Sequence, residues 1–252
     1  AKIIIWIVVL VLIVWGLASM SKKQPVGGTG EVVKVGAILP LTGSAAALGE
    51  PMKNGLDLAL KDQEGLAVSY EDSKAAPAEG ATAYQRLIAG GVDVVVSAYS
   101  GVSIPLTKLS VQNKIPLIMS LVAAADVTND YSYRYYARPT SYVVPAFADE
   151  ISPLKNLTNL AVLYRNDEYG NSVKDVLVAT AEQYGKTIVI SEAYQVNETN
   201  FSTALTKIKA AKPQALLFID GTPAEGVGIL KKAQELQLNA VVIEASAIFS
   251  DP

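Results

Sequence analysis

Short apolar runs alternate with longer segments of mixed polarity from residue 31 almost to the end of the chain. The runs are rich in Val, Ile and Leu and predict buried strands. Strands are expected at 32–39, 67–70, 92–97, 117–119, 160–164, 187–193, 215–219 and 240–243. The segments between them show helical spacing. Helices are expected at 49–63, 77–89, 105–113, 141–151, 171–184, 201–211 and 224–236.

This alternation predicts an α/β fold with parallel sheets that are covered on both faces. The stretch 121–135 is expected to be a loop, and the break in the pattern at 121–150 indicates two α/β units. In open sheets of this kind, ligands bind at the carboxyl ends of the strands. The loops that follow strands are therefore the places to look for a binding site.

The first twenty or so residues are of a different kind. Residues 3–18 carry no charge, and a helix continued to Met20 would span about 27 Å, close to the roughly 30 Å of a bilayer core. Three interpretations stay open: an uncleaved signal anchor, a cleaved signal peptide, or a buried core helix. The first two export the rest of the chain and assign residues 1–21 to the signal. Residues 22–31 then form a flexible linker rich in Gly and polar residues.

Composition narrows the chemistry. The 252 residues include no Cys and no His, which excludes thiol nucleophiles, disulfides, a lipid-bearing cysteine and every His-dependent triad. A net charge of −3 gives no sign of a nucleic-acid partner. Carboxylate, Lys or Tyr chemistry stays open, so an enzyme on a Rossmann-like scaffold is disfavoured but not excluded.

Four loops after strands carry small or hydroxylated residues: 40–44, 97–101, 165–170 and 220–223. The free N–H groups at a helix start suit a carboxylate or another anion. The same residue types are also the usual caps and turn formers, so one such loop alone is no evidence of a site. The run 221–226 starts like a phosphate-binding loop, but Val227 and Gly228 stand where Lys and Ser or Thr are needed.

At this point the motifs resemble a family. The opening 34–43 (KVGAILPLTG), Ser100-Gly101 with Pro105, the run 115–120 (IPLIMS), Arg138-Pro139 and Leu163-Tyr164 followed by Asp167, Tyr169 and Gly170 occur in the family's order. Together they are similar to the type 1 periplasmic binding proteins, in the leucine/isoleucine/valine-binding branch of ABC importers.

The resemblance implies two Rossmann-like lobes, 32–140 and 141–252, joined by three crossovers around a ligand cleft. It implies no cofactor. Ser100 would donate to a ligand carboxylate, and Tyr169 would cover the ligand from the second lobe. The implied ligand-binding residues are Tyr99, Ser100, Gly101, Val122, Ala123, Ala124, Tyr169, Asp220, Gly221, Thr222 and Ser246.

Departures from the family pattern bear on the ligand. The stretch Val122–Ala124 lacks a hydroxyl that amino-acid binders usually carry, and Ser246 stands where many use an acid for the ligand ammonium. The chain also ends inside the second lobe, which predicts a fragment or a shortened relative. The leading hypothesis is an extracytoplasmic binder of an amino acid or similar small polar solute that serves an ABC importer permease. The binder is held to the membrane by the N-terminal helix, or is periplasmic or secreted if that segment is cleaved. The alternative is a membrane-tethered sensor domain of a receptor.

Overall fold

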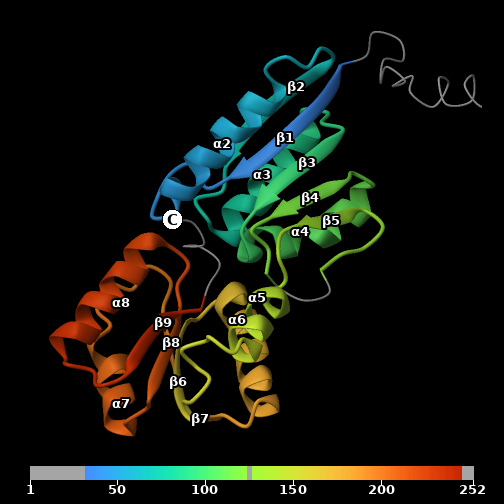
Figure 1. Ribbon diagram of the computed structural model, residues 1–252. Helices are drawn as coiled ribbons and strands as arrows, with labels where there is room; N and C mark the ends of the chain where they lie inside the picture. Colours follow the sequence, from blue (N-terminus) through green and yellow to red (C-terminus); the bar gives the residue numbers. More distant parts are fainter. Residues whose placement is uncertain (1–31, 124–126, 246–252) are drawn as a thin grey trace, which may run out of the picture.

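The computed structural model describes residues 32–123 and 127–245, which form two α/β lobes (Figure 1). The predicted signal segment 1–21, the linker 22–31 and the site residues Ala124 and Ser246 lie outside the described residues. Within the two described ranges, no helix is long and apolar enough to cross a membrane.

The first lobe is built on a parallel five-stranded sheet in the order β2-β1-β3-β4-β5. Its strands are β1 (Val33–Leu39), β2 (Leu66–Asp72), β3 (Val94–Ala98), β4 (Leu117–Ser120) and β5 (Ser132–Tyr135). Its helices are α2 (Ala46–Leu60), α3 (Pro77–Ala89) and α4 (Ser100–Asn113). The helix α2 lies on one face of the sheet, and α3 and α4 lie on the other (Figure 1).

The second lobe is built on a parallel four-stranded sheet in the order β7-β6-β8-β9. Its strands are β6 (Asn159–Arg165), β7 (Thr187–Tyr194), β8 (Ala215–Ile219) and β9 (Val241–Glu244). Its helices are α5 (Pro139–Ala148), α6 (Glu168–Gln183), α7 (Ser202–Ala211) and α8 (Pro223–Glu235). The boundary at residues 140 and 141 that the resemblance implies falls in the first turn of α5.

Separate apolar cores hold the lobes together. One cluster fills the first lobe around Ile38, Tyr84 and Leu106. The second sheet is packed on both faces: Leu177 belongs to the cluster beneath α5 and α6, and Leu205 to the cluster beneath α7 and α8. Burial on both faces explains why the strands read as nearly unbroken apolar runs.

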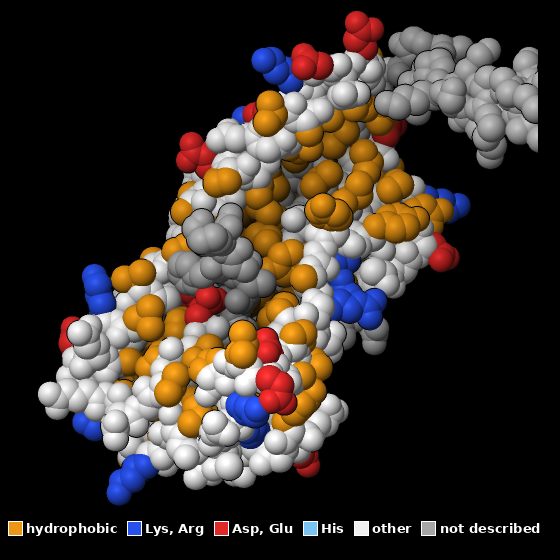
Figure 2. All heavy atoms as spheres, viewed as in Figure 1, with side chains coloured by type: hydrophobic (Ala, Val, Ile, Leu, Met, Phe, Trp, Pro, Cys, Tyr) orange, Lys and Arg blue, Asp and Glu red, His pale blue; other side chains and the backbone are white. Residues whose placement is uncertain are grey.

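Two expectations about local structure were wrong. Residues 132–135 form β5 within the stretch expected to be a loop, and α4 begins at Ser100 and not near Pro105. The strand carries polar and aromatic side chains, with Tyr133 55% and Tyr135 82% exposed, because β5 lies at the edge of its sheet. Figure 2 shows hydrophobic side chains gathered at the surface of the first lobe.

Candidate functional site

The order of the strands brings the candidate loops together. In the first sheet the strand order reverses between β1 and β3, and in the second it reverses between β6 and β8. A crevice forms at such a switch point, outside the carboxyl ends of the two strands. The loops 40–44 and 97–101 therefore lie side by side in the first lobe, and the loops 165–170 and 220–223 do so in the second.

A cavity lies between α2 and three of these loops, 97–101, 165–170 and 220–223, with a volume of about 310 Å³ that includes space open to solvent. We call it the inner cavity. The residues that line it come from both lobes: Leu48, Tyr99, Ser100, Leu121, Tyr136, Arg165, Tyr169 and Gly221. This lining is largely apolar, because it includes two leucines and three tyrosines. It contains one cation and few other polar groups that could orient a ligand.

The first turn of α4 supplies the polar end of the inner cavity. Ser100 opens the helix and is 1% exposed, and its Oγ accepts a hydrogen bond of 3.2 Å from the backbone N–H of Ala123. The hydroxyl hydrogen of Ser100 is then available to an acceptor. The first N–H groups of a helix have no partner within the helix and favour an anion. This end of the cavity suits a carboxylate.

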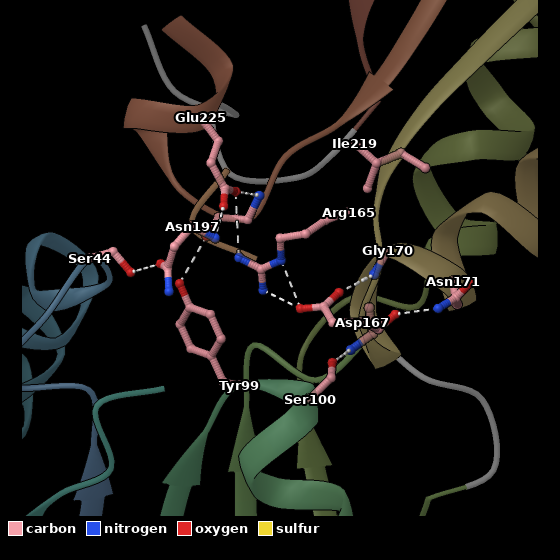
Figure 3. Close-up of polar contacts among 12 residues, drawn as sticks. Ser44, Tyr99, Ser100, Arg165, Asp167, Gly170, Asn171, Asn197, Ile219 and Glu225 are labelled. Carbon is pink, nitrogen blue, oxygen red and sulfur yellow. Dashed lines mark hydrogen bonds and ion pairs between the residues drawn. The ribbon is translucent and has the colours of Figure 1, made fainter. Parts of the chain in front are cut away.

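A buried cation forms the second-lobe wall. Arg165, the last residue of β6, is 4% exposed. Its Nε donates to Asp167 over 2.7 Å, its Nη2 pairs with the same carboxylate, and its Nη1 lies 3.5 Å from a carboxylate oxygen of Glu225 (Figure 3). Asp167 also caps α6, accepting a 2.8 Å hydrogen bond from the N–H of Gly170.

Glu225 joins two loops of the second lobe and the end of β7 through one carboxylate. It accepts hydrogen bonds from the backbone N–H of Gly221 at 2.9 Å, the Tyr194 hydroxyl at 3.3 Å and the backbone N–H of Asn197 at 3.3 Å. The residue lies in the first turn of α8, where Thr222 is the N-cap and its Oγ1 accepts from the Glu225 N–H. A negative charge is favoured at this end of a helix. The β8–α8 loop is thereby fixed against Arg165.

Tyr99 joins the two lobes. Its hydroxyl donates a 2.9 Å hydrogen bond to the carbonyl oxygen of Gly221, and its ring centroid lies 5.9 Å from the Arg165 Cζ atom (Figure 3). Burial raises the pKa of the Tyr99 hydroxyl to about 12. The positive charge of Arg165 acts to lower this pKa, and the negative charges of the nearby acids act to raise it. Tyr99 is therefore a neutral hydrogen-bond donor at physiological pH.

Burial lowers the pKa of the Arg165 guanidinium, but the charges of Asp167 and Glu225 outweigh burial and the net shift is upward. The arginine is a permanent cation whose charge is already matched by two carboxylates. A further anion therefore gains little electrostatic attraction from Arg165. A neutral acceptor on a ligand can still accept hydrogen bonds from the N–H groups of the guanidinium.

A second, larger cavity opens on the other side of Tyr99 and Gly221, with a volume of about 750 Å³ that includes space open to solvent. We call it the outer cavity. The polar residues that line it are Ser44, Asn197, Glu198, Thr199, Thr222 and Glu225. The lobes meet here as well, because the Ser44 hydroxyl donates a 2.5 Å hydrogen bond to the side-chain oxygen of Asn197 (Figure 3).

The structure brings some of the predicted site residues together and separates others. Tyr99, Ser100, Tyr169 and Gly221 line the inner cavity, and Thr222 lines the outer cavity. The remaining described candidates line neither of these two cavities: Gly101 follows Ser100 in α4, Val122 packs in the first-lobe core, Ala123 contacts Ser100 through its N–H, and the Asp220 side chain is fully buried.

The prediction missed four residues of the inner cavity: Leu48, Leu121, Tyr136 and Arg165. Arg165 carried a signal, since a charge that directly follows an apolar strand stands at the ligand edge of the sheet. Among the described residues, no group of three or more Asp or Glu side chains is placed to hold a metal ion.

Residues 32–251 match the periplasmic binding protein family. The chain belongs to that family. The match covers all of the described residues, so the resemblance drawn from the loop motifs is confirmed, as is the α/β fold with parallel sheets.

Curated relatives of this family member include Leu/Ile/Val-binding proteins and their homologs. One is BraC3 of Rhizobium johnstonii, 27% identical over 222 residues that make up 84% of this chain and 60% of the relative. Another is homolog 2 of Brucella abortus, 27% identical over 241 residues, or 89% of this chain and 64% of the relative. The chain thus spans less than two thirds of the length of these relatives. The relatives are binding proteins, which at the family level supports the prediction that the chain is not an enzyme.

Solved structures share the fold. A solute binding protein of an ABC transporter from Rhodopseudomonas palustris, in complex with 3,4-dihydroxy benzoic acid, is 22% identical with a TM-score of 0.74, covering 84% of this chain and 61% of that one. The leucine binding protein LivK from Thermotoga maritima is 19% identical with a TM-score of 0.75, covering 84% and 63%.

Proposed function

We propose that this chain binds an amino acid or a similar small carboxylate between its lobes and serves as the solute-binding component of an ABC importer. The observation that supports the proposal is the inner cavity, which both lobes line and which has the first turn of α4 at its polar end. Family membership supports an extracytoplasmic location.

In this proposal the ligand carboxylate lies at Ser100. The hydroxyl of Ser100 and the N–H groups of the first turn of α4 donate to it. Leu48 and Leu121 contact the apolar body of the ligand, and Tyr169 covers it from the second lobe. Binding is non-covalent, and the functional motion is closure of the lobes on the ligand.

The inner cavity defines the binding of a ligand carboxylate more fully than the binding of a ligand ammonium group. Among the described residues, no Asp or Glu lines the inner cavity, and Asp220 is fully buried. The two solved structures above are named for leucine and for a benzoic acid, and both ligands carry a carboxylate. The shared carboxylate is therefore the firmest element of the proposed ligand.

Isothermal titration calorimetry on the full chain tests the proposal with matched pairs of ligands. Leucine and 4-methylpentanoate differ by the ammonium group, whereas leucine and leucinamide differ by the carboxylate. We expect at least one carboxylate of a panel that includes benzoates to bind, and the amide to bind more weakly by about tenfold or more, because a charge-assisted bond is lost. Equal binding of acid and amide, or no binding across the panel, contradicts the proposal.

A further inference from the structure

Neighbouring residues of the β8–α8 connection line the inner and the outer cavity, and we call Tyr99 and Gly221 the wall between the two cavities. Tyr99 and Gly221 line the inner cavity, while Thr222 and Glu225, next along the same loop and helix, line the outer cavity. In Figure 3, Tyr99 lies between Ser44 and Asn197 on one side and Ser100 on the other. The bond from the Tyr99 hydroxyl to the Gly221 carbonyl oxygen, 2.9 Å long, closes this wall.

The backbone of Tyr99, which places its ring in this wall, is strained. Tyr99 has φ of 76° and ψ of 134°, a conformation that a bulky side chain rarely adopts. Its N–H donates to Ser120 over 3.2 Å and its carbonyl oxygen accepts from Ser103 over 2.8 Å, so strand and helix together impose the angle. Strain of this kind persists where the position of a side chain matters for function.

The two cavities differ in chemistry. The inner cavity offers a helix start and an apolar lining. The outer cavity is lined by hydroxyl and amide groups together with Glu198 and Glu225, and none of its described lining residues is Lys or Arg. The Glu225 carboxylate is already paired with Arg165, so the negative charge that this lining offers comes from Glu198. The outer cavity therefore suits a cationic or hydroxylated group and disfavours an anion.

We propose that Tyr99 is a specificity-determining residue that limits the length of the ligand. This inference rests on the proposed function. In this inference a short carboxylate binds at Ser100 while the Tyr99 hydroxyl stays bonded to Gly221. A longer ligand with a cationic or hydroxylated tail has to break that bond and displace the ring before its tail reaches the outer cavity. The wall thus selects against such ligands although the groups beyond it would bind them.

A ligand series tests the selection. The full chain, Tyr99→Phe, Tyr99→Ala and the control Tyr84→Phe are titrated with L-leucine, L-norleucine and L-lysine. Tyr84 is a buried tyrosine of the first-lobe core, so the control removes the same atom away from the wall. We expect Tyr99→Ala to raise the affinity for lysine relative to leucine by about tenfold or more, and Tyr99→Phe to do so less. An unchanged lysine-to-leucine ratio in Tyr99→Ala overturns the inference.

A second measurement needs no ligand. The chain has no cysteine, and Ser44 and Asn197 face each other across the lobes at 2.5 Å. In Ser44→Cys/Asn197→Cys, the rate of disulfide formation reports how often the lobes meet at the outer cavity. Adding Tyr99→Phe should slow disulfide formation by about three- to tenfold, because the closed arrangement of the lobes loses the free energy of one hydrogen bond. Adding Tyr84→Phe should leave the rate unchanged.

The two measurements separate the two proposals. Equal cross-linking rates with and without the Tyr99 hydroxyl, in a chain that binds its carboxylate, reject the role of Tyr99 alone. A slower rate in a chain that binds no carboxylate supports the Tyr99 contact and rejects the proposed function.

Discussion

Arg165 lies flat against the backbone of Gly221. A β-carbon built on Gly221 would stand 1.8 Å from Nη1 of Arg165 and 2.0 Å from its Cζ. The guanidinium cannot easily move aside, because Asp167 and Glu225 hold it and the side chain is 4% exposed. Gly221 is thus the residue that allows the β8–α8 loop to approach the end of β6.

Gly221→Ala is expected to lower the free energy of unfolding by about 1 to 3 kcal/mol, the usual cost of forcing atoms into a packed site. Either the loop or the guanidinium has to shift, so ligand affinity should fall as well. Urea unfolding followed by circular dichroism measures the first effect and calorimetry the second.

The matched control is Gly55→Ala. Gly55 lies in α2, is exposed, and has no heavy atom within 4 Å of the position of an added β-carbon. The substitution there should stabilise the protein by about 0.5 to 1 kcal/mol, because alanine favours the helix. Equal effects of the two substitutions would show that Arg165 does not press on Gly221.

The buried ion pair of Arg165 should contribute far more than a surface pair. Arg165→Gln leaves the carboxylates of Asp167 and Glu225 without their cation, which is expected to cost about 3 to 5 kcal/mol. Lys207→Gln breaks the exposed pair with Glu192, whose atoms are 2.9 Å apart, and should cost less than about 1 kcal/mol. Urea, which is uncharged, is the denaturant for both. Similar losses in the two variants contradict the buried-pair assignment.

Asp72 gives the β1–α2 loop a dependence on pH. The carboxylate accepts hydrogen bonds from the N–H groups of Leu41 at 2.9 Å, Thr42 at 3.2 Å and Lys74 at 2.9 Å, and from the Thr42 hydroxyl. Burial raises the pKa of Asp72, but these hydrogen bonds outweigh it and the net shift is downward. The charged form is therefore favoured in the folded protein.

Because the pKa of Asp72 is lower in the folded protein than in the unfolded chain, its contribution is complete at neutral pH and is lost as the pH falls through the folded value. Asp72→Asn should therefore be less stable than the wild-type chain at pH 7. The difference should shrink below about pH 4, where aspartate in the unfolded chain takes up its proton. Urea titrations from pH 7 to pH 3 measure it, and a difference that stays constant to pH 3 contradicts the prediction.

The sequence allowed most of the fold to be predicted because the central strands β1, β6 and β8 are largely buried on both faces. Such strands are rich in apolar residues, and β8 is an unbroken apolar run. The strand β5 lacks that signal, since its residues SYRY lie at the edge of a sheet and only Ser132 is buried. The start of α4 was misplaced because Pro105, which usually marks a first turn, stands inside this helix.

The loops of the site could be predicted, but not the contacts between them. Tyr99, Ser100 and Gly221 were found because they follow apolar strands, and the family pattern named the same loops. The bond from Tyr99 to Gly221 spans 122 residues and joins the two lobes, so no local pattern encodes it. The strain at Tyr99 is also invisible in sequence, because glycine is the residue that normally signals a positive φ.

Ser100 provides the most direct test of the carboxylate end of the cavity. Ser100→Ala removes a hydroxyl that accepts from the Ala123 N–H at 3.2 Å, and with it the proposed donor to the ligand. The affinity for a bound carboxylate should fall by about 10- to 100-fold, as expected for a hydrogen bond to a charged group. The matched control is Ser110→Ala in the same helix, where a buried hydroxyl bonds Thr107 and Ser132 away from the cleft. Both variants should lose about 1 to 2 kcal/mol of stability, but only Ser100→Ala should lose ligand. Similar affinities in the two variants, with the fold intact, would place the carboxylate elsewhere.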